Sequence, residues 1–66
     1  MTEIRINGKT AETEAATLLE LAKELGLPER GVALAIDGRL ARRELWAATA
    51  LREGSEVIIV KAAYGG

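Results

Sequence analysis

Hydrophobic and polar residues alternate at the start of the chain. Glu3 to Ile6 reads polar, apolar, polar, apolar, which is the period of two of a half-buried strand. Asn7-Gly8 follows and predicts a two-residue type I′ turn, because both central residues of that turn need positive φ. Lys9 to Glu12 is then the return strand, and its weak hydrophobicity favours a place near the edge of a sheet. These residues together predict a β-hairpin.

The next segment has the repeat of an amphipathic helix. The hydrophobic residues on its one apolar face are Leu18, Leu21, Ala22 and Leu25. Its start resembles a capping box, in which the Thr17 hydroxyl accepts from the Glu20 amide while the Glu20 side chain reaches back. Gly26 suits the left-handed position that follows a helix, and Pro28 prevents continuation. The sequence therefore predicts a short helix with defined ends.

A second hairpin is predicted in the middle of the chain. Val32 to Ile36 carries its large residues at alternate positions, as a strand does. Asp37-Gly38 supplies another tight turn, and Arg39 to Ala41 forms a short return strand.

The remainder contains a loop and one more strand. Arg42 to Leu51 has neither clean period, so we expect an irregular loop with one helical turn near Glu44 to Ala47. Trp46 is its expected anchor, packed against the body of the protein. Residues 52–55 form a turn, and Glu56 to Ala62 is the last strand.

This β-β-α-β-β order packs naturally as a sheet of four or five strands with one helix across one face. The last strand is apolar on both sides and should be central. If it pairs parallel to the first strand, the sheet is mixed and the α+β fold is a ubiquitin-like β-grasp. The pattern alone also allows a ferredoxin-like half or another small α+β roll. We expect residues 1–63 to form one domain and residues 64–66 to be a flexible C-terminal tail.

Alternation along the strands separates two faces of the sheet. The predicted inner face, which joins the helical leucines in the core, carries Ile4, Ile6, Val32, Leu34, Ile36, Val57 and Ile59. The predicted outer face carries Ala33, Ala35, Ile58, Val60 and Ala62. Only one helix is available, so the chain cannot cover both faces, and an exposed apolar patch of this kind marks a partner site. The alternatives are shielding of Ile58 and Val60 by the 42–51 loop, or ordinary isolated surface residues.

Composition narrows the chemistry. The 66 residues contain no cysteine and no histidine. Disulfides, thiolate metal sites and cysteine nucleophiles are excluded, and so is the commonest general base near neutral pH. We therefore expect no metal site, no cofactor bound by the chain itself and no independent enzymatic activity.

Charge and hydropathy exclude two classes of partner. Nine basic and ten acidic residues are interspersed, with a net charge of −1. The one basic group, Arg39 with Arg42 and Arg43, is expected to be a solvated loop, so nucleic-acid binding is not expected. The longest apolar stretches are too short to span a bilayer, and no signal peptide is recognised at the start. We expect a cytoplasmic protein that is a monomer when free.

The sequence closes on Gly65-Gly66. A glycine carboxylate has no neighbouring Cβ, and the backbone freedom of glycine lets such a tail extend into a narrow slot. A frayed terminus is the alternative interpretation. Following a compact domain, the tail of Tyr64, Gly65 and Gly66 suits a carboxylate that another enzyme must reach and modify.

Nearly the whole chain resembles the ThiS family of sulfur carrier proteins of thiazole (thiamin) biosynthesis. The residues that carry the resemblance are Ile6-Asn7-Gly8, Val32 to Gly38, Arg43, Trp46, Leu51 to Val60 and Gly65-Gly66. It implies that a ThiF-like adenylating enzyme uses ATP and Mg to convert the Gly66 carboxylate to an acyl-adenylate. A persulfide donor then supplies sulfur for a thiocarboxylate on Gly66, which a ThiG-like thiazole synthase consumes.

Three positions depart from the family pattern. Arg42 stands where proline is frequent and Ser55 where aspartate is frequent, and both affect turns only. Tyr64 stands where an aliphatic residue or a third glycine is common, within the tail itself. Other carriers with the same activation chemistry are the small subunit of molybdopterin synthase and tRNA-thiolation carriers. The absence of phenylalanine and the compact 52–54 turn favour the thiazole pathway. A non-covalent β-grasp interaction module is the alternative from another class.

Overall fold

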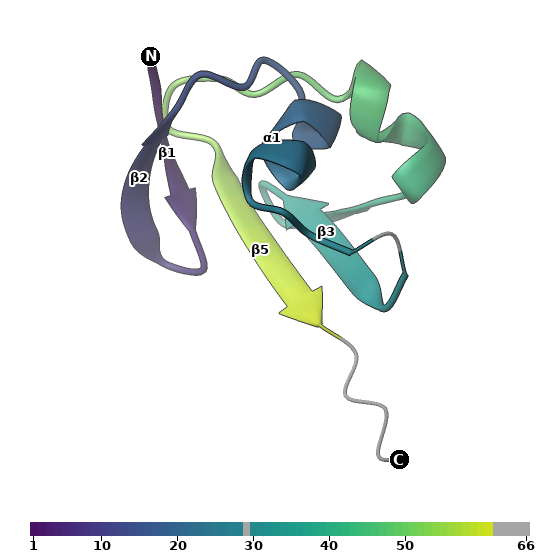
Figure 1. Cartoon of the computed structure of the whole chain (residues 1–66). Coiled ribbons are helices and arrows are strands. Elements are labelled where there is room, and N and C mark those ends of the chain that lie inside the picture. Colours follow the sequence, from purple (N-terminus) through teal and green to yellow (C-terminus); the bar gives the residue numbers. More distant parts are fainter. Residues whose placement is uncertain (29, 62–66) are drawn as a thin grey trace.

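The computed structural model describes residues 1–28 and 30–61. In that part of the chain, five strands form one sheet and one α-helix lies across it (Figure 1). The elements in chain order are β1 (Thr2–Ile6), β2 (Lys9–Thr13), α1 (Leu18–Glu24), β3 (Val32–Ile36), β4 (Arg39–Ala41), the 3₁₀ helix η1 (Arg43–Ala48) and β5 (Glu56–Lys61). All the predicted strands are therefore present, with bounds shifted by one residue at most among the described residues.

The sheet has the strand order β2-β1-β5-β3-β4. β1 and β5 are parallel, with Ile6 opposite Val57, while the other neighbours pair antiparallel. The last strand is therefore central and parallel to the first, as the sequence predicts. This mixed sheet with one helix on one face confirms the ubiquitin-like β-grasp fold.

Both predicted hairpin turns are confirmed by their backbone angles. Asn7 and Gly8 have φ of 51° and 84°, and Asp37 and Gly38 have φ of 50° and 85°. Two consecutive residues with positive φ define the type I′ turn, whose twist matches that of the strands that it joins.

The start of α1 differs in detail from the predicted capping box. The Thr17 Oγ1 accepts from the Glu20 amide at 3.2 Å, as expected. The Glu20 carboxylate, however, accepts from the Ala16 amide at 2.9 Å and not from the Thr17 amide. The chain enters the helix in an extended conformation at Thr17, which forms an isolated bridge with Ala50, and this places the Ala16 amide within reach.

The helix ends one residue earlier than its apolar repeat. The Gly26 amide donates to the Lys23 carbonyl and the Leu27 amide to the Ala22 carbonyl, at 3.1 and 2.9 Å, which is a Schellman motif. Leu25 is the C-cap residue, and its side chain is 42% exposed. The prediction that Leu25 belongs to the core is therefore wrong. Leu27, after the turn, packs against the core instead.

The core lies between α1, the inner face of the sheet and η1. Its buried hydrophobic residues are Ile4, Ala15, Leu18, Leu21, Ala22, Leu34, Trp46, Leu51 and Val57. Trp46 is the predicted anchor of the 42–51 segment: it is buried, and its Nε1 donates to the Ala41 carbonyl at 3.0 Å. Because it is held in this way, the segment forms six residues of 3₁₀ helix where a single turn was expected.

Thr13 joins the first hairpin to the helix. It ends β2 with its side chain buried, one residue beyond the predicted strand. Its hydroxyl donates to the Glu24 carboxylate at 2.7 Å and accepts from the Ala15 amide at 3.0 Å. A buried polar side chain is thereby satisfied in both of its hydrogen-bonding roles.

Candidate functional site

The outer face of the sheet is apolar over its β3–β5 half. Val60 lies directly opposite Ala33, and Ile58 lies opposite Ala35. Successive side chains on a strand point to opposite faces, so these four share the face that does not carry α1. The buried residue Val57, next to Ile58, marks the inner face.

Exposure distinguishes the two faces of β5. Val57 is fully buried, whereas Ile58 is 38% exposed and Val60 is 55% exposed. The alternative that the 42–51 loop shields Ile58 and Val60 does not apply, because η1 packs beside α1 on the inner side (Figure 1). The structure thus places the described members of the predicted interface together and accessible.

Leu40 extends this surface, and the sequence interpretation missed it. It lies on β4 opposite Ala35 and is 73% exposed. The signal was present in the sequence: a two-residue turn at Asp37-Gly38 pairs residue 36 with 39 and residue 35 with 40. We call the five residues Ala33, Ala35, Leu40, Ile58 and Val60 the outer apolar face.

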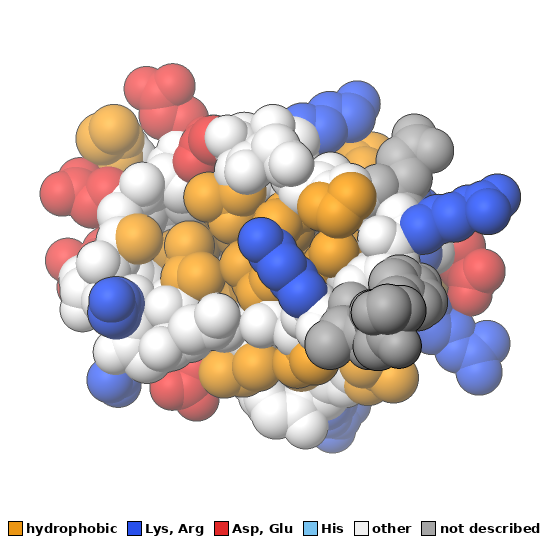
Figure 2. Space-filling model, turned by 60° about the horizontal axis from the view of Figure 1, so that its bottom comes forward, with side chains coloured by type: hydrophobic (Ala, Val, Ile, Leu, Met, Phe, Trp, Pro, Cys, Tyr) orange, Lys and Arg blue, Asp and Glu red, His pale blue; other side chains and the backbone are white. Residues whose placement is uncertain are grey.

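The outer apolar face has recognisable limits. On the β1 side the sheet turns polar, because Arg5 is exposed and lies opposite Glu56. Where β5 ends, a shallow hollow of about 290 Å³ is lined by Gly31, Val32, Ala33 and Val60. Hydrophobic side chains gather at this end of the molecule (Figure 2). The apolar surface therefore extends to the point at which the chain continues toward residue 66.

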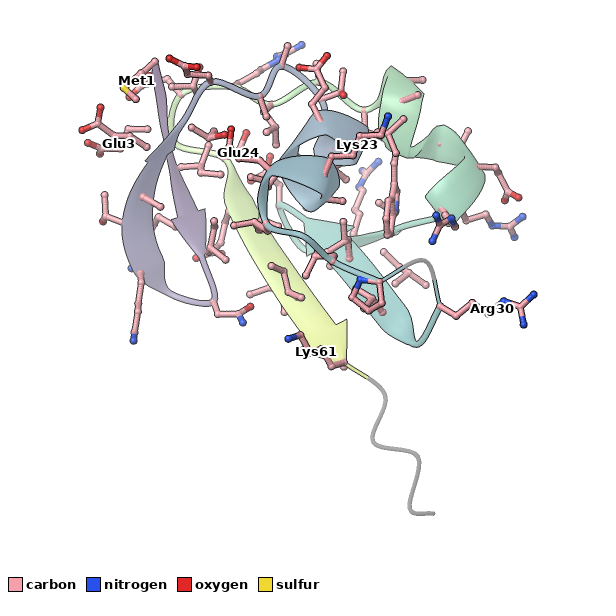
Figure 3. The ribbon with its side chains drawn as sticks, in the orientation of Figure 1. Met1, Glu3, Lys23, Glu24, Arg30 and Lys61 are labelled. Carbon is pink, nitrogen blue, oxygen red and sulfur yellow. The ribbon has the colours of Figure 1, made fainter. Side chains whose placement is uncertain are left out.

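Charged side chains differ between the two ends of the sheet. Lys61 and Arg30 lie at the end where β5 ends, while Glu3 lies at the opposite end, near Met1 (Figure 3). At that end the Glu3 backbone amide donates to Glu53 Oε1, in the nearby turn, at 3.2 Å. The end of the sheet at which β5 ends therefore carries two cations, Lys61 and Arg30.

The three arginines considered for nucleic-acid binding have different surroundings. Arg39 pairs with Ile36 across the second hairpin, on the inner side of the sheet. Arg42 lies 4.0 Å from Glu44, and both are exposed. The Arg43 guanidinium lies 5.3 Å from the centre of the Trp46 ring. All three are exposed, as predicted.

Two features, a metal-binding cluster and a membrane-spanning helix, are absent from the described residues. No group of three or more acidic, histidine or cysteine side chains there is arranged to hold a metal ion. No helix among residues 1–28 and 30–61 is long and apolar enough to cross a membrane.

The predicted tail lies outside the described residues. This applies to Ala62 of the predicted interface, to the boundary between residues 63 and 64, and to Tyr64, Gly65 and Gly66. The described residue nearest to the tail is Lys61, the last residue of β5.

Comparison with known proteins places this chain in a family. The sequence model of the ThiS family matches residues 3–66. A crystal structure of a thiamine biosynthesis protein (ThiS) from Geobacter metallireducens has a TM-score of 0.82 at 25% identity, covering 98% of this chain and 100% of that one. An NMR solution structure of a thiamine biosynthesis protein from the same organism has a TM-score of 0.80 at 25% identity, covering 98% and 88%. No curated protein matches the sequence. Since the family match spans almost its whole length, the chain belongs to the ThiS family.

Proposed function

We propose that this chain is a sulfur carrier of thiamine biosynthesis, whose Gly66 carboxylate is activated by a partner enzyme and converted to a thiocarboxylate. Membership of the ThiS family and similarity to a thiamine biosynthesis protein support the carrier role. One structural observation supports the docking step. Ile58 and Val60 are exposed on β5, the strand that precedes the Gly65-Gly66 tail in sequence.

The chemistry begins with a carboxylate that resists nucleophiles until one of its oxygens becomes part of a good leaving group. An oxygen of the Gly66 carboxylate attacks the α-phosphate of ATP and releases pyrophosphate, which leaves an acyl-adenylate. The terminal sulfur of a persulfide then attacks the acyl carbon and displaces AMP. A thiol finally attacks the donor-side sulfur, so that a disulfide forms and the thiocarboxylate is released on Gly66.

The chain takes part in this sequence as a substrate of other proteins. A ThiF-like adenylating enzyme supplies the site for ATP and Mg, and a ThiG-like thiazole synthase accepts the sulfur. The carrier supplies no acid, base or oxyanion donor, which agrees with the absence of cysteine and histidine from its sequence. Its own contribution is to dock through the outer apolar face and to present the tail as a monomer.

Three alternative functions share either the carboxylate activation or the docking surface with this proposal. The small subunit of molybdopterin synthase and the tRNA-thiolation carriers use the same carboxylate activation, so they differ only in the enzyme that receives the sulfur. A non-covalent interaction module would use the outer apolar face without Gly66. The match to the ThiS family favours the thiazole pathway over these alternatives.

ATP–pyrophosphate exchange with the ThiF-like enzyme of the same genome tests the activation step. The wild-type chain should support exchange, and a chain that lacks Gly66 should not. Removal of one residue draws the carboxylate back by about 3.5 Å, which is too far for attack on the α-phosphate. Thermal unfolding should be unchanged, because the tail follows the last described strand. Exchange that persists without Gly66 would contradict the proposal.

A further inference from the structure

The strand that leads to the tail extends beyond its neighbour on one side. Pairing between β1 and β5 ends with Ile6 opposite Val57, but β5 continues to Lys61. On its other side, β5 pairs with β3 as far as Val32 opposite Lys61. The backbone groups of β5 beyond Val57 that point toward β1 therefore have no partner strand.

The side chain of Asn7 takes the place of the missing strand. Its backbone amide donates to the Val57 carbonyl at 2.9 Å. Its Oδ1 accepts from the Ile59 amide at 2.7 Å, and its Nδ2 donates to the Ile59 carbonyl at 3.4 Å. The carboxamide thus offers Ile59 the one acceptor and one donor that a paired residue of a neighbouring strand would offer.

Asp37 holds the same position in the second hairpin turn as Asn7 does in the first, and the comparison explains why residue 7 is an asparagine. Asp37 flanks the start of β5: its backbone amide donates to the Glu56 carbonyl at 2.8 Å, and its Oδ1 accepts from the Glu56 amide at 2.9 Å. There the main chain supplies the donor, so a carboxylate, which only accepts, is sufficient. At Ile59 the side chain must supply both groups, which a carboxamide can do and a carboxylate cannot.

We propose that Asn7 is a positioning residue for the C-terminal tail, which it directs by holding β5 extended at Ile59, on the side where the strand has no neighbour. This inference rests on the proposed function. Gly66 follows Ile59 by seven residues, a reach of at most about 25 Å. With Ile59 held, β5 leaves the domain in a fixed direction. Without it, the end of β5 is paired with β3 alone, and the point from which the chain continues toward Gly66 is held less firmly.

The matched variants are Asn7→Gly and Asp37→Gly. Glycine accepts the positive φ of either turn, so each variant removes a side-chain contact with β5 and keeps the hairpin. Asn7→Asp adds a third case, since it keeps the acceptor for the Ile59 amide and loses the donor to the Ile59 carbonyl.

Amide hydrogen exchange, measured by NMR, gives the structural readout. In Asn7→Gly, the Ile59 amide should exchange at least about 10-fold faster relative to global opening. The amides of Ile58 and Val60 should stay protected, because alternate amides of β5 point toward β3. Asn7→Asp should retain protection at Ile59. A structural loss of stability alone would affect all three amides together.

Steady-state adenylation by the ThiF-like enzyme gives the functional readout. Asn7→Gly should lower kcat by about 3- to 10-fold with little change in KM, because docking through the outer apolar face is intact while delivery of the tail is not. Asn7→Asp should be intermediate, and Asp37→Gly should leave kcat unchanged. If the Ile59 amide of Asn7→Gly exchanges at the wild-type rate, or if kcat falls equally in Asp37→Gly, the inference about Asn7 is overturned and the proposed function is not. A wild-type chain that is not adenylated overturns the proposed function as well.

Discussion

Val60→Asp separates docking from folding. Val60 is 55% exposed on the outer apolar face, so an aspartate there stays hydrated in the free protein. We expect the free energy of unfolding to fall by no more than about 1 kcal/mol, which is the span of strand propensities. The variant should therefore fold as the wild type does, with the same far-UV circular dichroism.

Binding should respond differently. Fully burying a valine contributes about 1.5–3 kcal/mol, so burying the exposed half of Val60 at an interface contributes about 1 kcal/mol. The aspartate loses this contribution and must also shed water against an apolar partner without a matched cation. The total penalty is about 2–4 kcal/mol, which weakens Kd by about 30- to 1000-fold. Isothermal titration with the adenylating enzyme and with thiazole synthase measures it.

Two controls accompany this variant. Thr10→Asp makes the same change of charge at an exposed position of β2, opposite Arg5 and separated from β5 by the strand β1, and should leave both Kd values unchanged. Val57→Asp puts a charge at a fully buried position and should unfold so small a domain. The reasoning is refuted if Val60→Asp binds both partners at the original Kd, or if it unfolds while Val57→Asp is tolerated.

Two further predictions concern stability, and urea unfolding followed by circular dichroism measures both. Thr13→Val keeps the shape of a buried side chain but loses its bonds to the Ala15 amide and the Glu24 carboxylate, so it should cost about 1–3 kcal/mol. No loss would mean that these bonds contribute nothing net. Trp46→Phe removes the donor to the Ala41 carbonyl and leaves part of the ring volume empty, for a cost of about 2–4 kcal/mol. A cost below about 1 kcal/mol would show that Trp46 does not anchor η1.

The fold was largely predictable because local signals agreed with one another. Asn7-Gly8 and Asp37-Gly38 determine the hairpin registers. The alternating direction of side chains along a strand then separates Val57 and Ile59 from Ile58 and Val60. Leu25 failed as a core residue for a local reason. Gly26 turned the chain before the apolar repeat was complete, and the repeat alone does not say which of its last members is lost.

The contributions of single side chains were harder to predict, because they depend on residues far away in the sequence. Asn7 was recognised as a turn residue, but its contact with Ile59 spans the first and last strands. Leu40 could have been placed on the outer apolar face from the hairpin register. At the start of α1, the Glu20 carboxylate accepts from the Ala16 amide and not from the Thr17 amide. This choice depends on the bridge between Thr17 and Ala50, which no local sequence pattern reveals.

Mass spectrometry of the intact chain tests the central claim most directly. The protein is incubated with the ThiF-like enzyme, ATP, Mg, a persulfide donor and a thiol. The account predicts a mass increase equal to the difference between one sulfur and one oxygen atom, and fragmentation should place the change at Gly66. Modification of an internal residue, or an unchanged mass with the enzyme active on another carrier, would contradict the proposal that Gly66 carries the sulfur.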